Sequence, residues 1–201
     1  MSDNGPDGSA YYAKRDFGHV QTALDINGES IELRGRKNFN HEAGHRVPFL
    51  WRWPARWQPR VVGDPAIPVS YLDVYRTLAD IIGATLPCNE APDSRSLISL
   101  LDGTEPSEML KRSKILTHAK KGAQLAFRKR MWKWIPGDNA LYNLERDIEE
   151  KENLVQFEWG AEFAQSLNAS MNGIVEFIAN REKVTQKGKI ETCFKNPYIW
   201  V

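Results

Sequence analysis

Two stretches of the chain carry apolar residues at the spacing of an amphipathic helix. In the first, one stripe is formed by Tyr71, Val74, Tyr75, Leu78 and Ile82. Ser70 is a suitable N-cap, Asp73 suits the positive end of a helix, and Gly83 follows the last turn. These signals predict a helix over residues 70–82 with one apolar face.

The second stretch lies near the end of the sequence. One face of this predicted final helix is formed by Phe163, Leu167, Met171, Ile174 and Ile178. Gly173 lowers the helix propensity there without interrupting the pattern. A shorter helical turn is predicted over residues 97–101, directly before Asp102 and Gly103.

Alternation with a period of two predicts strands in two other regions. Between residues 46 and 53, one face collects Val47, Phe49, Trp51 and Trp53, and Pro54 ends the segment. Farther along, residues 125–128 and 131–135 form a predicted hairpin, and residues 140–144 form a third strand after a Gly-Asp-Asn turn. Residues 1–32 are polar and are expected to be a long loop, and a boundary is expected within residues 103–113.

Size and charge exclude some classes of function. A chain of 201 residues can bury one large core or two small ones. Its formal net charge of +1 argues against a nucleic-acid or acidic-membrane partner. No apolar run is long enough to cross a bilayer, and the first residues do not resemble an export signal. Cys88 and Cys193 have no metal-ligand spacing, and packed or surface thiols are favoured over a disulfide.

Two segments carry candidate binding chemistry with more than one interpretation. Asp3 and Asn4 are adjacent oxygen donors that suit a hard cation, but Asp-Asn-Gly also forms ordinary Asx-turns without metal. Lys37 follows a glycine turn and offers three N–H donors to a tetrahedral anion. It also lies in a basic run with Arg34 and Arg36, where an exposed lysine without a binding role is the ordinary interpretation.

Several further patterns favour structure over chemistry. His19 lies in a polar loop and is either an ordinary loop histidine or a pocket residue. The sequence His-Glu-Ala-Gly-His at residues 41–45 approaches a zinc-binding pattern, which requires a helix that Gly44 and Pro48 oppose. The tryptophans of residues 51–57 could stack on bases, but alternate tryptophans on a strand are more often core. Asn168 begins a glycosylation sequon within the final helix.

In their order along the chain, several segments resemble the sulfatases. The resemblance covers nearly the whole chain and is carried by residues 2–6 (Ser-Asp-Asn-Gly-Pro), Lys37, 42–44 (Glu-Ala-Gly), 46–49 (Arg-Val-Pro-Phe), 52–54 (Arg-Trp-Pro), 73–83, 93–97, 127–128, 132–133, 141–144 and 150–154. It implies an α/β fold: residues 1–108 would form the end of an alkaline-phosphatase-like sulfatase domain. Residues 109–201 would form a small C-terminal α+β domain, with a helix packed on an antiparallel sheet.

The resemblance also implies roles for individual residues. Asp3 and Asn4 would be calcium ligands, Lys37 would bind the sulfate group and act in catalysis, and His19 would reach the substrate pocket. The substrate would be a sulfate-ester small molecule or a sulfated glycan. Family members are commonly periplasmic, secreted or lysosomal, whereas no sequence feature indicates an oligomeric state.

Departures from the family pattern affect the expected activity. Sulfatases use a formylglycine made within a Cys-x-Pro-x-Arg motif, and the contexts of Cys88 and Cys193 do not match it. The aspartate pair that completes the calcium site is also absent, and Ala43 replaces a glycine. We therefore expect a truncated sulfuric-ester hydrolase that is inactive alone. The alternatives are a non-catalytic remnant that binds an anion or a partner, and a phosphate or phosphonate monoester hydrolase.

Overall fold

The computed structural model describes residue 5 and residues 22–24, 29–61, 67–87, 90–91, 93–104, 114–119 and 124–186. Its first half contains the short strands β1 (Thr22–Leu24) and β2 (Ser30–Glu32), then the helices α2 (Glu42–His45), α3 (Asp73–Ile81) and α4 (Ile98–Asp102). The second half contains β3 (Lys114–Ala119), β4 (Gln124–Lys129), β5 (Trp132–Ile135), β6 (Ala140–Asn143) and the long helix α6 (Glu158–Gln186). Single 3-10 turns, η1 (Pro136–Asp138) and η2 (Leu154–Gln156), precede β6 and α6.

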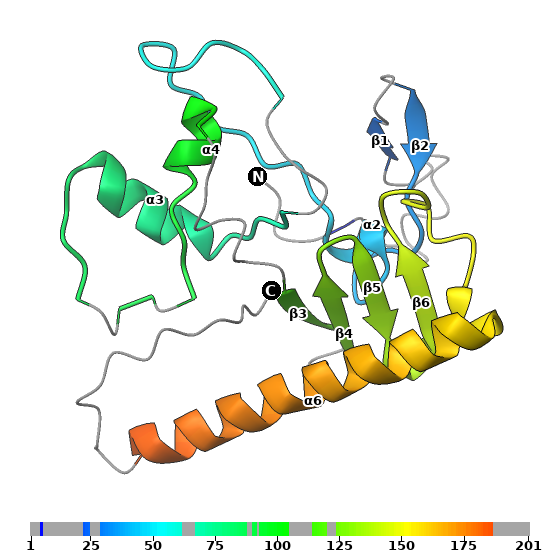
Figure 1. Ribbon diagram of the computed structural model, residues 1–201. Helices are drawn as coiled ribbons and strands as arrows, with labels where there is room; N and C mark the ends of the chain where they lie inside the picture. Colours follow the sequence, from blue (N-terminus) through cyan, green and yellow to red (C-terminus); the bar gives the residue numbers. More distant parts are fainter. Residues whose placement is uncertain are drawn as a thin grey trace, which may run out of the picture.

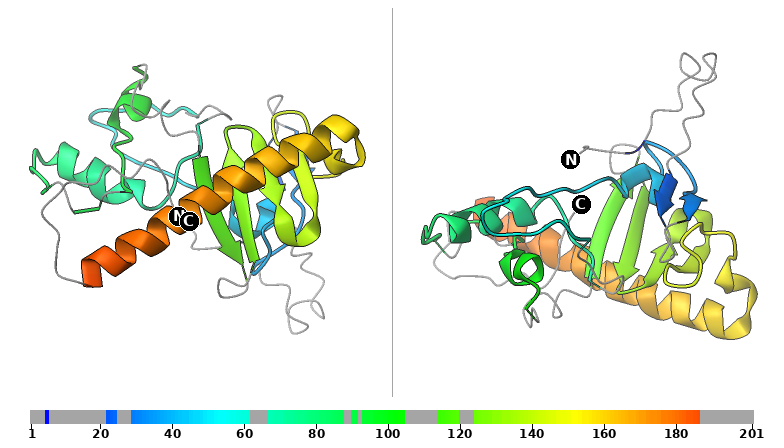
Figure 2. Two further views of the ribbon diagram at one scale, coloured as in Figure 1. Left: turned by 60° about the horizontal axis from the view of Figure 1, so that its bottom comes forward. Right: turned by 90° about the horizontal axis from the view of Figure 1, so that it is seen from above.

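The four strands of the second half form an antiparallel meander in the order β3-β4-β5-β6. Its register pairs Phe127 with Trp134 and Trp134 with Leu141, so large side chains lie side by side on one face. Helix α6 crosses that face diagonally, and α2 lies against the opposite face (Figure 1). The view from above shows the same three layers (Figure 2).

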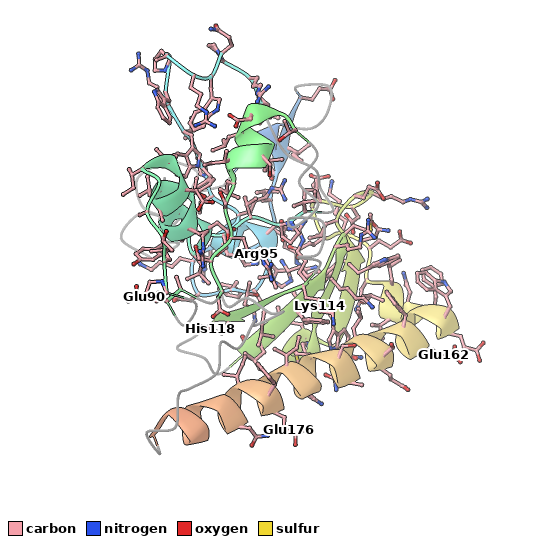
Figure 3. The ribbon with its side chains drawn as sticks, turned by 60° about the vertical axis from the view of Figure 1, so that its left-hand side comes forward. Glu90, Arg95, Lys114, His118, Glu162 and Glu176 are labelled. Atoms are coloured by element: carbon pink, nitrogen blue, oxygen red, sulfur yellow. The ribbon has the colours of Figure 1, made fainter. Side chains whose placement is uncertain are left out.

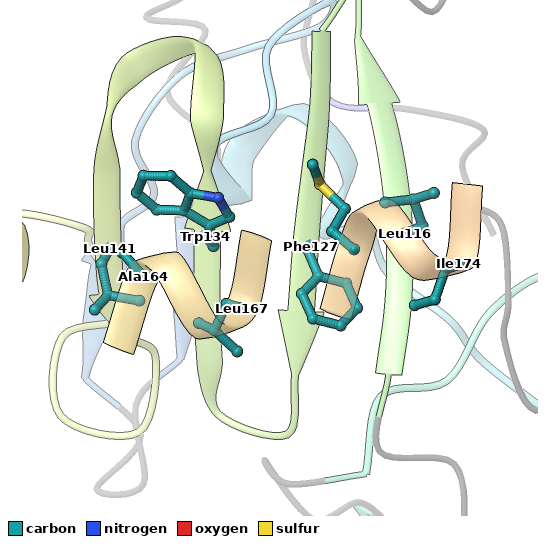
Figure 4. Close-up of a cluster of buried hydrophobic side chains, with 8 residues drawn as sticks. Leu116, Phe127, Trp134, Leu141, Ala164, Leu167 and Ile174 are labelled. Carbon is teal, nitrogen blue, oxygen red and sulfur yellow. The ribbon is translucent and has the colours of Figure 1, made fainter. Parts of the chain in front are cut away.

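The main hydrophobic core lies between the sheet and α6 (Figure 4). The strands contribute Leu116, Phe127, Trp134 and Leu141, and the helix contributes Ala164, Leu167, Met171 and Ile174. Leu167, Met171 and Ile174 of the predicted stripe are buried. Glu162 and Glu176 lie on the opposite, exposed side of α6 (Figure 3). The predicted final helix is thereby confirmed.

The other face of the sheet is only partly apolar. Because side chains alternate along a strand, the residue between Trp132 and Trp134 points away from α6. That residue is Lys133, which is 1% exposed. A second cluster of buried residues consists of Ala126, Ile135, Ala140, Tyr142 and Leu144. The polar segment that contains α2 covers the remainder, so a charged side chain is buried at the interface between the two halves of the chain.

Helix α3 is held to the preceding and following loops by buried polar groups. The Asp73 carboxylate accepts hydrogen bonds from the Ser70 and Arg95 amides at 2.8 and 3.0 Å. The Thr77 hydroxyl accepts from the Leu97 amide at 2.9 Å. The expected helix is confirmed, but it begins at Asp73 after the N-cap residue Leu72, so the predicted cap at Ser70 is wrong. The apolar stripe is not buried either: Leu78 is 48% exposed and Ile82 is 76% exposed.

One predicted element is wrong. Residues 46–53 form no strand, because none of the described segments lies beside them to complete a hydrogen-bonded ladder. The predicted alternation is nevertheless present: Val47, Phe49, Trp51 and Trp53 are half-buried while their neighbours are exposed. Phe49 and Trp51 pack against the small cluster formed by Ile67, Leu97 and Leu101.

The remaining differences concern short elements. The pattern missed β3 and the hairpin β1-β2, which falls inside the segment expected to be a loop. The expected hairpin, third strand and short helical turn appear as β4-β5, β6 and α4. Among the helices that the structure describes, none has the length and apolar character of a membrane span.

Truncation of the α6 stripe should therefore cost far more stability than truncation of the α3 stripe. We expect Leu167→Ala to lower the free energy of unfolding by about 2–5 kcal/mol, because a buried leucine leaves a cavity. Leu78→Ala should cost less than about 1 kcal/mol, since its side chain is half-exposed already. Urea unfolding of both variants checks this, and equal losses would show that the α3 stripe is covered in solution.

Candidate functional site

Lys37 lies on a tight loop that runs from Arg34 to Gly44. The loop is closed by a hydrogen bond from the Ala43 amide to the Arg34 carbonyl at 2.9 Å. Within it, the Phe39 amide donates to the Arg36 carbonyl at 3.0 Å, so Lys37 occupies the first inner position of a turn. Backbone hydrogen bonds within the loop thus fix the position of the Lys37 main chain.

Two glycines are required for this loop to form. Gly35 has a φ of +86°, a left-handed conformation that residues with a side chain rarely adopt. At Gly44, any Cβ atom would collide with the Phe39 carbonyl oxygen. The glycine of the Glu-Ala-Gly segment is therefore needed for close backbone approach.

The Lys37 side chain is half-buried, and its amine has no hydrogen-bond or ion-pair partner among the described residues. Its neighbour Arg36 is engaged differently, because its guanidinium lies 5.4 Å from the centre of the Phe39 ring. A lysine amine without such a partner can bind an anion through all three of its N–H donors.

A buried group of charges lies beneath the loop, between α2 and the sheet. The Lys133 amine lies 2.9 Å from Glu42 Oε1 and 2.8 Å from Glu150 Oε1. Glu42 and Glu150 are both 0% exposed. Arg46 donates to the other Glu42 oxygen at 3.0 Å. Each buried carboxylate thus has a cation at contact distance, which such charges require.

Further hydrogen bonds tie the loop to the sheet. The Glu42 amide donates to Glu150 Oε2 at 2.7 Å. Arg34 donates to the Tyr142 hydroxyl at 2.9 Å and to the Glu150 carbonyl at 2.8 Å. Asn40 donates to the Gln124 carbonyl at 3.2 Å. Both ends of the loop are therefore anchored to the antiparallel sheet.

The environment shifts the pKa values of the two acids in opposite directions. Burial alone would raise the pKa of Glu42, but the surrounding positive charges, first that of Lys133, hold it well below its usual range. Burial raises the pKa of Glu150, and Lys133 offsets only part of that effect. Glu42 is therefore the fully ionised partner of Lys133, and Glu150 is the acid that protonates more readily.

The two histidines that flank Glu42 are held neutral. Burial, with the positive charges of Arg34 and Lys133, lowers the pKa of His41 to about 4. Burial, followed by the charge of Lys133, lowers the pKa of His45 to about 4. The His45 ring lies 3.0 Å from the Asn40 carbonyl and 3.3 Å from the Lys133 amine. His41 instead lies 3.8 Å from Asp138.

The expectation that Gly44 and Pro48 prevent a helix at this point needs correction. A single helical turn, α2, forms over Glu42–His45, because it ends before Pro48 and because Gly44 removes the clash with Phe39. The two histidine rings have different partners. Across the part of the chain that the structure describes, no group of three His, Cys, Asp or Glu side chains could hold a metal ion.

The other predicted site residues are Asp3, Asn4 and His19, and they lie outside the described residues, as do Cys88 and Cys193. Gly5, which follows Asn4, is described and buried. Its amide donates to the Gly44 carbonyl at 3.0 Å. The backbone of Gly5 therefore contacts the end of the Lys37 loop, although the two are far apart in the sequence.

Sequence patterns alone did not identify Lys133 and Glu150 as parts of this region. The available signal was weak: a lysine between two tryptophans on a predicted strand must lie on the face away from the aromatic core. A single lysine at such a position is usually exposed. Only the partner segment, which lies 91 positions earlier at Glu42, decides that Lys133 is buried.

The chain is similar to several sulfatases, although no family model matches it. It is 29% identical over 176 residues to the N-acetylgalactosamine-6-O-sulfatase of Bacteroides thetaiotaomicron, which covers 77% of this chain and 32% of that protein. It is 43% identical over 79 residues to the steryl-sulfatase of Mus musculus, covering 39% of this chain and 12% of that protein. The chain thus spans less than a third of the length of these curated relatives.

The fold is also similar to that of a solved sulfatase structure. A sulfatase studied in the metabolism of multiple glycosaminoglycans by Bacteroides thetaiotaomicron superposes with a TM-score of 0.57 and 27% sequence identity. The match covers 70% of this chain and 31% of that chain. The predicted α/β class, with an alkaline-phosphatase-like sulfatase fold and an antiparallel sheet, is confirmed.

Burial of two neutral histidines predicts that the fold loses stability in mild acid. An unfolded histidine has a pKa of about 6.5, so between pH 4 and 6.5 the unfolded chain binds more protons than the folded one. Stability therefore falls as the pH drops through this window. Glu150 opposes the trend with its raised pKa, and we expect a net loss of about 2 kcal/mol between pH 7 and pH 5.

Urea unfolding at the two pH values measures this loss. The double variant with His41→Asn and His45→Gln should show a much smaller difference between pH 7 and pH 5. His118→Gln serves as the control, because His118 is exposed on β3 and its removal should leave the difference unchanged (Figure 3). Equal stability of the unmodified chain at both pH values would contradict the assignment.

Proposed function

We propose that this chain, which is similar to the sulfatases in sequence and in fold, is part of a sulfuric-ester hydrolase and supplies its sulfate-binding lysine. The substrate class is a sulfate ester, either a small molecule or a sulfated glycan. Lys37 is the residue assigned to the sulfate group. A compact cation on a rigid loop can stabilise the charge that develops on the sulfate oxygens during attack.

One observation carries this proposal: the Lys37 amine has no partner in the described part of the chain, although the loop around it is fixed on both sides. A surface lysine that merely solubilises the chain needs no such support. The contact between Gly5 and Gly44 adds to the argument, because it ties the Asp-Asn-Gly segment to the same loop. We propose that positions 3, 4 and 37 line one anion pocket.

Calcium is part of the proposal at Asp3 and Asn4. Calcium takes about 6–8 oxygen ligands, so these two residues could supply only part of a site. The described residues contain no acidic cluster that would complete it. When bound, calcium would neutralise sulfate oxygens beside Lys37. His19 is proposed to reach the same pocket.

The nucleophile is proposed to come from outside this sequence. Neither Cys88 nor Cys193 stands in a Cys-x-Pro-x-Arg segment. The exposed apolar stripe of α3 supports a larger assembly, because the apolar face of an amphipathic helix is normally buried against another element. We therefore propose residues 1–108 as part of a sulfatase catalytic domain and residues 109–201 as its smaller C-terminal domain.

Sulfate binding at Lys37 can be measured directly by NMR titration of the chain with inorganic sulfate. We expect saturable shifts of the Lys37 side-chain signals and of the backbone amide signals of the same loop. Measured from the amide signals, Lys37→Met should weaken binding by at least about tenfold. Lys129→Met is the matched control, since Lys129 lies at the end of β4 opposite to Gln124, where the loop is anchored. Equal losses in both variants would indicate non-specific attraction.

Competition between anions separates the proposed ester classes. If sulfate and phosphate displace each other with equal affinity, a phosphate or phosphonate monoester becomes the better assignment. Absence of any saturable binding would favour the non-catalytic alternative.

We expect the isolated chain to show no turnover of an aryl sulfate, because its sequence contains no formylglycine motif. The measurement is release of the phenol from a chromogenic aryl sulfate by highly purified chain. Steady hydrolysis that is lost in Lys37→Met would contradict this expectation and would show that another group acts as the nucleophile.

A further inference from the structure

We propose that Glu150 and Lys133 are positioning residues for Lys37. They lie on the antiparallel sheet and its following loop, and they hold the segment from Arg34 to Ala43 in the conformation that presents the Lys37 amine. The inference rests on the proposed function, because it concerns the same anion site.

Glu150 contacts both ends of the loop that carries Lys37. Its carbonyl oxygen accepts from Arg34 at 2.8 Å, where the loop begins. Its carboxylate accepts from the Glu42 amide at 2.7 Å, where the loop ends. One residue therefore fixes the separation of the two ends, and the hydrogen bond between Ala43 and Arg34 completes the closure.

Lys133 allows Glu150 to remain in this place. Two buried carboxylates, those of Glu42 and Glu150, face the same small volume and would repel each other without a cation between them. The Lys133 amine lies within 2.9 Å of one oxygen from each. Without it, the carboxylate of Glu150 would protonate or move, and the acceptor for the Glu42 amide would weaken.

The position that the buried charges impose on the loop explains them better than a gain in stability alone. Buried ion pairs replaced by apolar residues of similar volume often leave a protein as stable as before. An apolar pair could not accept the hydrogen bond from the Glu42 amide at the end of the loop. The network therefore supplies a directional contact that the position of Lys37 requires.

Two charge-balanced double variants test this role, each compared with the unmodified chain. The first combines Lys133→Met with Glu150→Gln, which keeps an oxygen acceptor for the Glu42 amide. The second combines Lys133→Met with Glu150→Leu, which removes that acceptor. In both, the Glu42 carboxylate keeps Arg46 as its partner at 3.0 Å.

The first readout is sulfate affinity, measured from the Lys37 side-chain signals by NMR titration. We expect the leucine variant to bind sulfate about tenfold more weakly and the glutamine variant to stay within about threefold of the unmodified chain. Leu167→Ala is the control for stability loss alone, since its site lies in the core on the other face of the sheet. Its folded form should bind sulfate normally. Equal affinity of the two double variants would overturn the proposal.

The second readout does not depend on sulfate. Hydrogen exchange of the Phe39 and Ala43 amides should accelerate in the leucine variant and stay slow in the glutamine variant. If the unmodified chain binds no sulfate, the proposed function fails, while these exchange rates still decide whether Glu150 holds the loop.

If the leucine variant does not fold, Arg34→Met tests the same idea from the exposed end of the loop. It removes the contacts to Tyr142 and Glu150 without leaving a buried charge unpaired. Faster exchange at Ala43 with weaker sulfate binding supports the proposal, and unchanged values for both would overturn it.

Discussion

The contact of the Lys133 amine with two buried carboxylates is the interaction on which the two halves of the chain depend. An ammonium group and two carboxylates can leave water only together, because each alone would carry a desolvation cost of several kcal/mol. The pairing joins Glu42 of the first half to β5 and the loop after β6. The halves therefore dock in one register, which apolar contact alone would specify less sharply.

The sheet has two faces with different tasks. Toward α6 it is dry and apolar, and its side chains interlock around Phe127 and Leu167. This face provides stability through burial of apolar area. Toward α2 it offers the charges and hydrogen-bond acceptors that hold the Lys37 loop. The apolar core on one face thus gives a stable support to the directional contacts on the other face, which hold the loop that carries Lys37.

The region around α3 reverses the usual order of an amphipathic helix. Polar side chains such as Asp73 and Thr77 are buried because they accept backbone hydrogen bonds from the neighbouring loops. The apolar residues, including Leu78 and Ile82, remain exposed. Such a helix is held by polar contacts within this chain, while its apolar face remains exposed.

Apolar spacing correctly predicted α6, the β4-β5 hairpin and β6, because periodicity indicates one buried face. The same signal located helix α3, although its apolar face is exposed. The assignment of Lys37 to the sulfate group came from the resemblance and stays a prediction. Tertiary structure alone decided that residues 46–53 pair with no other described segment. It also decided that the α3 stripe is exposed and that Lys133 is buried, because each outcome depends on which distant residues lie opposite. Partners more than 90 positions apart, such as Glu42 and Lys133, leave no periodic trace in a single sequence.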